Sequence, residues 1–244
     1  DRIASMARRL GMGQILGAGL PGEQRGLIPT RAWKRQAKGT SWQQGETVLA
    51  GIGQGFILTT PLQLAVMISR LVNGGRAVQP SLTRQIISQS DHASQIRVSS
   101  DFEKIGVHPT HLEVMARAMA AVTNSPTGTA YKARIRDGKR AMGGKTGTVQ
   151  VRRISKAERE TGVLKNEDLE WHERDHAVFV GFAPVHTPRY AVSVVVEHGG
   201  SGSSSAAPIA RDILLEVQRR DPTRNTGNSQ AGQTPKIQSE REEG

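Results

Sequence analysis

The fold of this chain is decided by the stretch Gly143-Gly144-Lys145-Thr146-Gly147-Thr148, which runs directly into Val149-Gln150-Val151. An apolar alternation that follows a pair of glycines predicts a β-strand over residues 145–151. One ammonium group and two hydroxyl groups stand at the start of this strand. These groups make the strand a candidate binding surface. The rest of the sequence must show which fold the strand belongs to.

The segments after this strand predict the rest of a small sheet. Apolar runs at 177–183 and 190–197 are joined by the turn-forming residues 184–189, which is the pattern of an antiparallel hairpin. Residues 152–175 are too rich in charge to belong to the core. A helix is expected over 206–217, where it can lie across the sheet. Its inward side is expected to consist of Ile209, Ile213, Leu214 and Val217.

Helices are also expected upstream. The clearest begins at Thr60-Pro61, because Thr caps a helix well and Pro is tolerated in the first turn. Asn73-Gly74-Gly75 is its stop signal. Further helices are expected over 3–10 and 110–123, and glycines and prolines make most of 11–55 a predicted loop. The inward stripe of the helix at 110–123 is expected to be Leu112, Met115, Met119 and Val122.

The composition excludes some classes of function. The 244 residues carry a net charge of +11, but the basic residues are scattered and aromatic residues make up only 4%. So few stacking groups argue against nucleic acid as a partner. The absence of cysteine excludes disulfides and thiolate chemistry. Residues 1–220 are expected to form one domain, and the polar residues 221–244 a disordered tail.

Three signature-like patterns fail on their context. Gly17-Ala18-Gly19-Leu20-Pro21-Gly22 has dinucleotide-binding spacing, but no strand precedes it and Pro21 disrupts the required turn. Gly144-Lys145-Thr146 ends like a phosphate-binding loop, but the glycine needed five positions before Gly144 is Lys139. His172-Glu173-Arg174-Asp175-His176 has zinc-hydrolase spacing, but it runs into a strand instead of lying on a helix. No metal and no cofactor are therefore expected.

The residues from Lys145 to Thr148 each have a role that their chemistry explains. Lys145 can attract a substrate carboxylate and favour deprotonation of a neighbouring hydroxyl. Thr146 and Thr148 can hydrogen-bond that carboxylate, and the Thr148 N–H can supply half of an oxyanion hole. Gly147 leaves room for an extended substrate along the strand edge. Lys145 and Thr148 are thus the candidate catalytic residues, and Thr146, Gly147 and Thr148 the candidate substrate-binding residues.

Lys-Thr-Gly before an apolar strand is the third active-site element of serine acyl-transfer enzymes. The first two elements are missing, since neither Ser-x-x-Lys nor Ser-x-Asn occurs anywhere in the sequence. The chain also begins at Asp1 and not at Met. We therefore expect it to be a piece of a longer polypeptide, in which a membrane anchor or export signal can lie upstream.

Further motifs recur in order along the chain. The first half contains GLPGE (19–23), GLIPT (26–30), WQQGET (42–47), IGQG (52–55) and TPLQ (60–63). The second half contains TGTA (127–130), GKTGT (144–148), DHAVFVGFAP (175–184) and EHGG (197–200). At these intervals the motifs resemble the penicillin-binding protein 2 family, the elongation-type class B transpeptidases of bacterial cell-wall synthesis. The resemblance spans nearly all of residues 1–219.

The resemblance implies the α+β fold of serine β-lactamases and penicillin-binding proteins, in which helices flank a five-stranded antiparallel sheet. Residues 1–220 would be the C-terminal part of the transpeptidase domain, without its first strands and nucleophile helix. The implied activity is D,D-transpeptidation of peptidoglycan stem peptides through an acyl-enzyme on an upstream serine, which β-lactams would also acylate. The resemblance further implies a periplasmic position, an upstream helix in the inner membrane and a membrane partner that polymerises glycan.

The four residues from Lys145 to Thr148 match the family's third motif one by one and inherit the roles given above. No residue of the chain can be assigned as nucleophile or general base, because the first two motifs are absent. We expect the isolated chain to fold poorly, with the strand at 191–196 left as an unpaired edge, and to form no acyl-enzyme. The alternative is a non-catalytic module of the same fold that binds cell-wall peptides or a synthesis partner without turnover.

Overall fold

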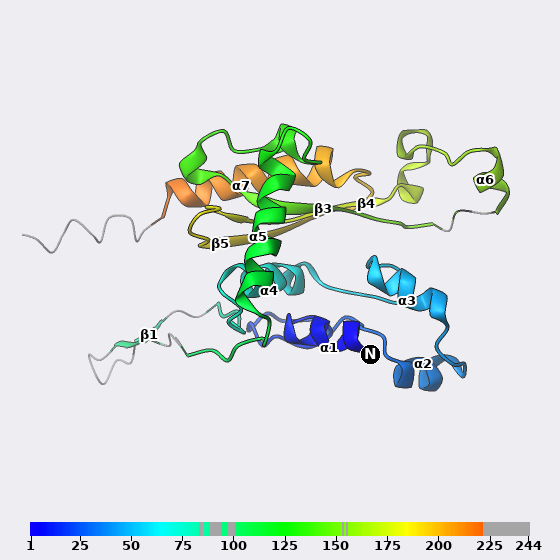
Figure 1. The fold of residues 1–244 in the computed structure, drawn as a ribbon, viewed down its shortest axis with the longest axis horizontal. Helices are drawn as coiled ribbons and strands as arrows, with labels where there is room; N and C mark the ends of the chain where they lie inside the picture. Colours follow the sequence, from blue (N-terminus) through cyan, green and yellow to red (C-terminus); the bar gives the residue numbers. More distant parts are fainter. Residues whose placement is uncertain (83–84, 88–93, 97–100, 153, 155, 222–244) are drawn as a thin grey trace, which may run out of the picture.

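The structure is a computed structural model that describes residues 1–82, 85–87, 94–96, 101–152, 154 and 156–221 (Figure 1). The α-helices are α1 (Arg2–Arg9), α2 (Arg31–Lys38), α3 (Gln44–Gly51), α4 (Pro61–Val72), α5 (Pro109–Asn124), α6 (Lys156–Thr161) and α7 (Ala207–Arg219). The strands are β1 (Gln85–Ile87), β2 (Ser94–Ile96), β3 (Gly143–Val149), β4 (His176–Ala183) and β5 (Tyr190–Val196). Short helical turns are η1 (Tyr131–Ala133), η2 (Gly138–Arg140), η3 (Asn166–Asp168), η4 (Trp171–Glu173) and η5 (Gly202–Ala206).

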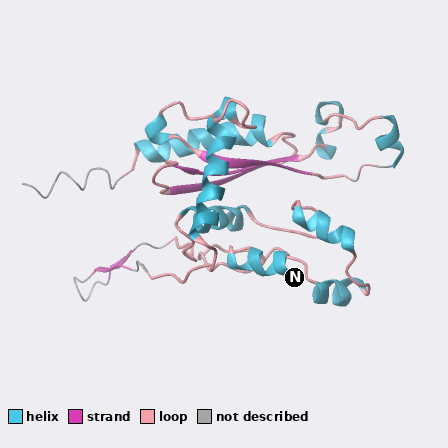
Figure 2. Ribbon diagram, in the orientation of Figure 1, coloured by secondary structure: helices cyan, strands magenta, loops and turns pink. Residues whose placement is uncertain are grey.

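The main sheet is antiparallel, with the strand order β3-β4-β5 (Figure 2). This confirms the predicted strand and hairpin. Lys145 of β3 lies opposite Val180 of β4, and Phe179 of β4 lies opposite Val194 of β5. Among the described strands, β5 has a neighbour on one side only, so the expected unpaired edge is present. The strand pair β1-β2 is separate from this sheet.

Helices cover both faces of the sheet, with α7 on one side and α4 and α5 on the other (Figure 1). The middle strand β4 is buried on both faces. Its Phe179 packs with Ala210 and Leu214 of α7, whereas Phe182 packs in the cluster that contains Ile68 of α4. Burial on both faces explains why the sequence of β4 is a continuous apolar run and not an alternation of apolar and polar residues. The observed α+β architecture agrees with the expected fold class.

Helix α4 begins and ends where the sequence predicts. The Thr60 hydroxyl accepts a hydrogen bond from the Gln63 N–H at 3.2 Å, and the Gln63 side chain accepts one from the Thr60 N–H at 3.3 Å. This reciprocal capping box satisfies two N–H groups that a helix start otherwise leaves unpaired. Asn73 caps the other end.

Helix α5 was also predicted, but its inward stripe differs from the expected one. Leu112 and Met119 are buried, whereas the side chain of Met115 is 46% exposed and Thr123 is fully buried. The helix crosses from the lower layer to the sheet (Figure 1). Each end therefore packs against a different layer, and the middle of the predicted stripe faces solvent.

The predicted inward side of α7 was half wrong. Ile209 and Ile213 are 45% and 44% exposed, and the α7 residues that pack in the same core cluster as the sheet are Ala207, Ala210 and Leu214. Small side chains allow a helix to approach a sheet closely, so alanines occupy the contact and the larger isoleucines point away.

The segment predicted to be mostly loop contains two helices, α2 and α3. The Thr30 hydroxyl caps α2 by accepting from the Trp33 N–H at 3.1 Å. Lys34 of α2 and Glu46 of α3 form an ion pair with an N–O distance of 2.5 Å. Polar caps and this ion pair stabilise both helices, and α3 has no buried residue. Apolar periodicity therefore could not reveal them.

Part of the sequence expected to form the C-terminal tail is not described by the structure. Residues 222–244 of the expected tail lie outside the described residues, as do 83–84 next to β1. Asp221, at the boundary, forms an ion pair with Arg189 at 2.5 Å. The described residues include no helix with the length and apolar character needed to span a membrane.

Candidate functional site

Strand β3 is held in place at its first residues by α5. The Thr123 hydroxyl donates to the Met142 carbonyl oxygen at 2.6 Å, and the Asn124 amide donates to the same oxygen at 2.9 Å. Gly144 lies against the ring of Phe179 and the carbonyl of Val180, where a Cβ atom would overlap both. Only glycine permits this approach, so the Gly143-Gly144 pair sets how closely β3 lies on the sheet.

The four predicted site residues follow on this strand, and their side chains divide between its two faces. Thr146 and Thr148 lie opposite Phe179 and Ala177, on the face that α7 covers. Lys145 lies opposite Val180, on the α4–α5 face. The Lys145 ammonium donates to the Thr146 carbonyl oxygen at 2.5 Å and is otherwise exposed. The structure therefore places the two threonine side chains on one face of this edge strand and the Lys145 side chain on the other.

Thr129 lies beside the candidate site, although sequence reasoning did not assign it. Its hydroxyl lies 3.1 Å from the Thr146 hydroxyl. The next residue is tied to α5, since the Ala130 N–H donates to the Val122 carbonyl at 3.0 Å. The signal for this residue was the TGTA motif at 127–130, which carried the resemblance without a stated role. A third hydroxyl thus joins Thr146 and Thr148.

The turn η5 lies against the main chain of β3 and β4. Gly202 lies against the backbone of Gly147 and Val178, where no side chain would fit. The turn is fixed to the loop that precedes it, because the Ser205 hydroxyl donates to the Gly199 carbonyl at 2.6 Å. The main chain around Gly147 is therefore bordered by a second main-chain segment, which limits what can approach it from that face.

The outer edge of β3 pairs with no other strand in the described part of the chain. An extended peptide can add to such an edge through main-chain hydrogen bonds. The role of the Thr148 N–H in an oxyanion hole remains a prediction, because the opposing N–H would belong to the nucleophile.

The zinc-hydrolase spacing does not form a metal site. His172 lies on η4 and His176 begins β4, so the two residues share no helix. The Nδ1 atom of His176 accepts a hydrogen bond from the His198 N–H at 2.9 Å. Within the described residues, no group of three metal-binding side chains gathers at one point.

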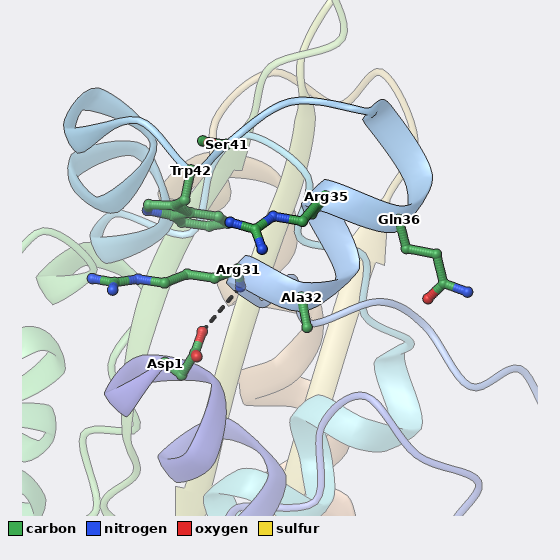
Figure 3. A pocket seen from close by; sticks show the side chains of 7 residues that line it. All are labelled: Asp1, Arg31, Ala32, Arg35, Gln36, Ser41 and Trp42. Atoms are coloured by element: carbon green, nitrogen blue, oxygen red, sulfur yellow. Dashed lines mark hydrogen bonds between the residues drawn. The ribbon is translucent and has the colours of Figure 1, made fainter.

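An open pocket of about 810 Å³ lies away from this strand, beside α2 (Figure 3). The Asp1 carboxylate accepts a hydrogen bond from the Arg31 N–H at 3.0 Å, and the side chain of Arg35 points toward Trp42. None of the predicted site residues lines this pocket. The candidate site is therefore chosen for the chemistry of the β3 side chains and not for the volume of a cavity.

Comparison with known proteins agrees with this geometry. Residues 1–215 match the penicillin binding protein transpeptidase domain, and the chain belongs to this family. Peptidoglycan D,D-transpeptidase MrdA of Salmonella typhimurium is 33% identical over 214 residues, which cover 88% of this chain and 34% of that protein. The chain thus spans about a third of the length of this curated relative.

Solved structures of penicillin-binding protein 2 have the same fold. The Pseudomonas aeruginosa protein, in complex with WCK 5153, is 34% identical with a TM-score of 0.71, over 89% of this chain and 43% of that one. The Helicobacter pylori protein, in complex with MreC, is 27% identical with a TM-score of 0.69, over 87% of this chain and 35% of that one. These similarities confirm the family that the ordered motifs resemble.

Proposed function

We propose that the protein containing this chain is a peptidoglycan D,D-transpeptidase that cross-links stem peptides during cell elongation. In this proposal β3 is the substrate-binding strand and the nucleophilic serine lies upstream of Asp1. The observation that carries it is the edge strand with Lys145 and with the hydroxyls of Thr146 and Thr148 on one face, in a chain whose curated relatives are named as D,D-transpeptidases.

The proposed roles follow from the positions on β3. The terminal carboxylate of the donor peptide binds the Thr146 and Thr148 hydroxyls, which share one face. The donor backbone lies along the free edge of β3, where Gly147 presents no side chain. Lys145 supplies positive charge next to the reacting groups. The Thr148 N–H contributes to the oxyanion hole when the upstream serine attacks the carbonyl.

The chain alone is proposed to be inactive. It contains neither Ser-x-x-Lys nor Ser-x-Asn, so it holds a substrate-binding strand without a nucleophile. The proposed partners of the whole protein are stem peptides, β-lactams and a membrane protein that polymerises glycan. The proposed location is the periplasmic side of the inner membrane, with an anchoring helix outside this chain. The solved complexes of penicillin-binding protein 2 with WCK 5153 and with MreC support the proposal that the protein binds small molecules and partner proteins. The glycan-polymerising partner and the location rest on the family resemblance alone.

Covalent labelling with a fluorescent penicillin tests the proposal. The full-length gene product should be labelled, and the isolated 244-residue chain should not. Thr148→Val should slow labelling of the full-length protein by roughly tenfold or more, because it removes a hydrogen bond to a charged group. Thr187→Val, an exposed threonine in the turn between β4 and β5, is the matched control and should label normally.

The same experiment separates the enzyme from a non-catalytic module. A full-length protein that carries both upstream motifs and is labelled supports the transpeptidase. A full-length protein without a Ser-x-x-Lys, or one that binds penicillin reversibly without a covalent adduct, would contradict it and favour the binding module.

A further inference from the structure

Three rings from separate segments meet where β3 and β4 run into the charged residues 152–175. Trp171 belongs to η4, His176 begins β4, and His198 lies in the turn that follows β5. The ring centres of Trp171 and His198 are 4.4 Å apart, and those of His176 and His198 are 4.6 Å apart. We call these three residues the ring cluster. His198 is its central member, because its ring contacts both of the others.

His198 is also fixed by hydrogen bonds at two different atoms. Its main-chain N–H donates to Nδ1 of His176 at 2.9 Å. Its own Nδ1 lies 2.9 Å from the carbonyl oxygen of Arg174, and this nitrogen carries a proton because a carbonyl can only accept. The φ angle of His198 is 54°, in the left-handed region that residues other than glycine seldom adopt. These contacts therefore hold the turn in a conformation that the chain would otherwise leave.

The turn that His198 fixes leads directly to the candidate site. The Gly200 N–H donates to the carbonyl oxygen of Asp175 at 2.8 Å. Gly202, four residues after His198, begins η5 and lies against the main chain of Gly147 in β3. A Cβ atom at Gly202 would overlap the Gly147 carbonyl oxygen, so the two segments are in close contact. A displacement of the turn is therefore transmitted to the contact between η5 and β3.

The hydrogen bond between the two histidines exists only while His176 is neutral. Its Nδ1 atom accepts through a lone pair, and a protonated imidazole has no lone pair left. The added proton would point at the His198 N–H, which is a donor too. If His198 were also protonated, two charged rings would lie 4.6 Å apart. Imidazoles ordinarily change charge between about pH 8 and about pH 5, so acid in this range removes the contact.

The charged groups next to the ring cluster do not offset this change. They are Arg152, Glu173, Arg174, Asp175 and Glu197. Arg152 forms an ion pair with Glu158 at 2.5 Å, and the Arg174 guanidinium donates to the Leu169 carbonyl at 3.0 Å. Within the described residues no carboxylate forms an ion pair with either imidazole of the cluster. A proton gained by His176 therefore costs the bond to His198 without creating an ion pair in its place.

We propose that His176 is a pH-sensitive positioning residue that keeps η5 against β3 while it is neutral and releases η5 when it is protonated. The inference rests on the proposed function and adds a regulation of the same site. Neither His176 nor His198 touches the reacting groups in this scheme, and both act through Gly202. At neutral pH the main chain of Gly147 is bordered by η5, and in acid η5 moves away and acylation slows.

The first test is the rate at which a fluorescent penicillin labels the full-length gene product at about pH 8 and about pH 5. His176→Asn replaces Nδ1 by an amide oxygen that still accepts and does not titrate in this range. We expect this variant to be labelled within about twofold of the wild-type rate at the higher pH. Its loss of rate on acidification should be about fivefold smaller than the wild-type loss.

Two further variants complete the comparison. His186→Asn makes the same change at an exposed histidine in the turn between β4 and β5, and it should keep the full wild-type loss of rate. His176→Leu fills the space of the ring but accepts no hydrogen bond, so it should be labelled about fivefold more slowly than wild type even at the higher pH. Titration of the upstream catalytic groups is common to all four proteins and cancels between them.

Hydrogen exchange of the amides in residues 197–206 reports the turn itself. After correction for the intrinsic effect of pH, exchange in the wild-type protein should be about fivefold faster at the lower pH, and His176→Asn should remove this difference. The measurement on the wild-type protein needs no substitution, so it decides the question even if a variant fails to fold.

The outcomes separate the two proposals. If wild type and His176→Asn lose labelling rate equally in acid, or if exchange over 197–206 in the wild-type protein is the same at both pH values, the role of His176 is wrong and the transpeptidase assignment stands. If the wild-type protein is labelled at neither pH, the proposed function fails and this inference fails with it.

Discussion

Thr123 and Met142, 19 residues apart, are joined by a 2.6 Å hydrogen bond from the Thr123 hydroxyl to the Met142 carbonyl oxygen. Both residues are fully buried. Met142 directly precedes β3, so this bond attaches the start of the candidate substrate-binding strand to α5. The position of Lys145 and the residues after it therefore depends on α5, a helix that contributes no group to the site itself.

Thr123→Val should lower the free energy of unfolding of the full-length protein by about 1 kcal/mol. Valine keeps the methyl group and removes the hydroxyl, and the effect stays small because the Asn124 amide still donates to Met142 at 2.9 Å. Urea denaturation measures the change. Thr110→Val, at the exposed start of the same helix, is the control and should have no effect beyond a few tenths of a kcal/mol. Equal stability of the two variants would contradict the role of this bond.

Gly202→Ala should weaken substrate binding more than it weakens the fold. A Cβ atom there would overlap the carbonyl oxygens of Gly147 and Val178, so η5 must move away from β3. We expect penicillin labelling to slow by roughly tenfold, since misplacement of a site by about 1 Å has effects of this size or larger. Gly138→Ala places the same atom in open space and should label at the wild-type rate. Normal labelling of Gly202→Ala would show that η5 does not border the site.

Apolar periodicity predicted the elements whose large side chains face the core and failed where small or polar groups make the contact. Helix α4 was found from its Thr60 cap, its Pro61 and its apolar residues together. Helix α7 was found too, but its sheet-facing side was misassigned because Ala207 and Ala210 make the contact instead of Ile209. Sequence cannot say how closely a helix approaches a sheet, and that distance decides which side chains fit.

The candidate site shows the same limit. The four residues from Lys145 to Thr148 are contiguous, so a motif could identify them. Thr129 joins them only through the loop that α5 holds, and Gly202 joins them only through the turn after β5. Contacts of this kind arise from tertiary packing, and the spacing in the sequence carries no distance information about them.

Thr129→Val should slow acylation by penicillin about threefold to tenfold without a change in thermal stability of more than a few degrees. The variant keeps the shape of the side chain and removes the hydroxyl that lies 3.1 Å from that of Thr146. Thr127→Val is the matched control from the same loop, because the Thr127 hydroxyl is paired with that of Ser125 at 3.0 Å and not with β3. If both variants react at the wild-type rate, Thr129 does not belong to the site.

The ionisation of the Glu46 carboxyl should make the stability of the α2–α3 region depend on pH. Hydrogen bonds from the Gln43 N–H and the Lys34 ammonium lower the pKa of the Glu46 carboxyl. A carboxylate with a lowered pKa in the folded state stabilises the protein above its ordinary pKa of roughly 4.3 and loses this contribution as the pH falls through the lowered value. Glu46→Gln should therefore lower the melting temperature at pH 7, and the difference from wild type should narrow toward pH 3. A difference that stays constant from pH 7 to pH 3 would contradict this account.

The free edge of β5 should control whether the isolated chain stays soluble. Among the described strands β5 pairs only with β4, and Val195 on this edge strand is 39% exposed. Exposed apolar edge strands pair with other chains, and a lysine on the edge opposes such pairing. Val195→Lys should therefore raise the monomeric fraction of the isolated chain in size-exclusion chromatography. Val163→Lys makes the same charge change at a residue that is 52% exposed and lies between α6 and η3, away from the sheet edge, and it should not raise that fraction. Equal gains from both variants would mean that added charge, and not the β5 edge, limits solubility.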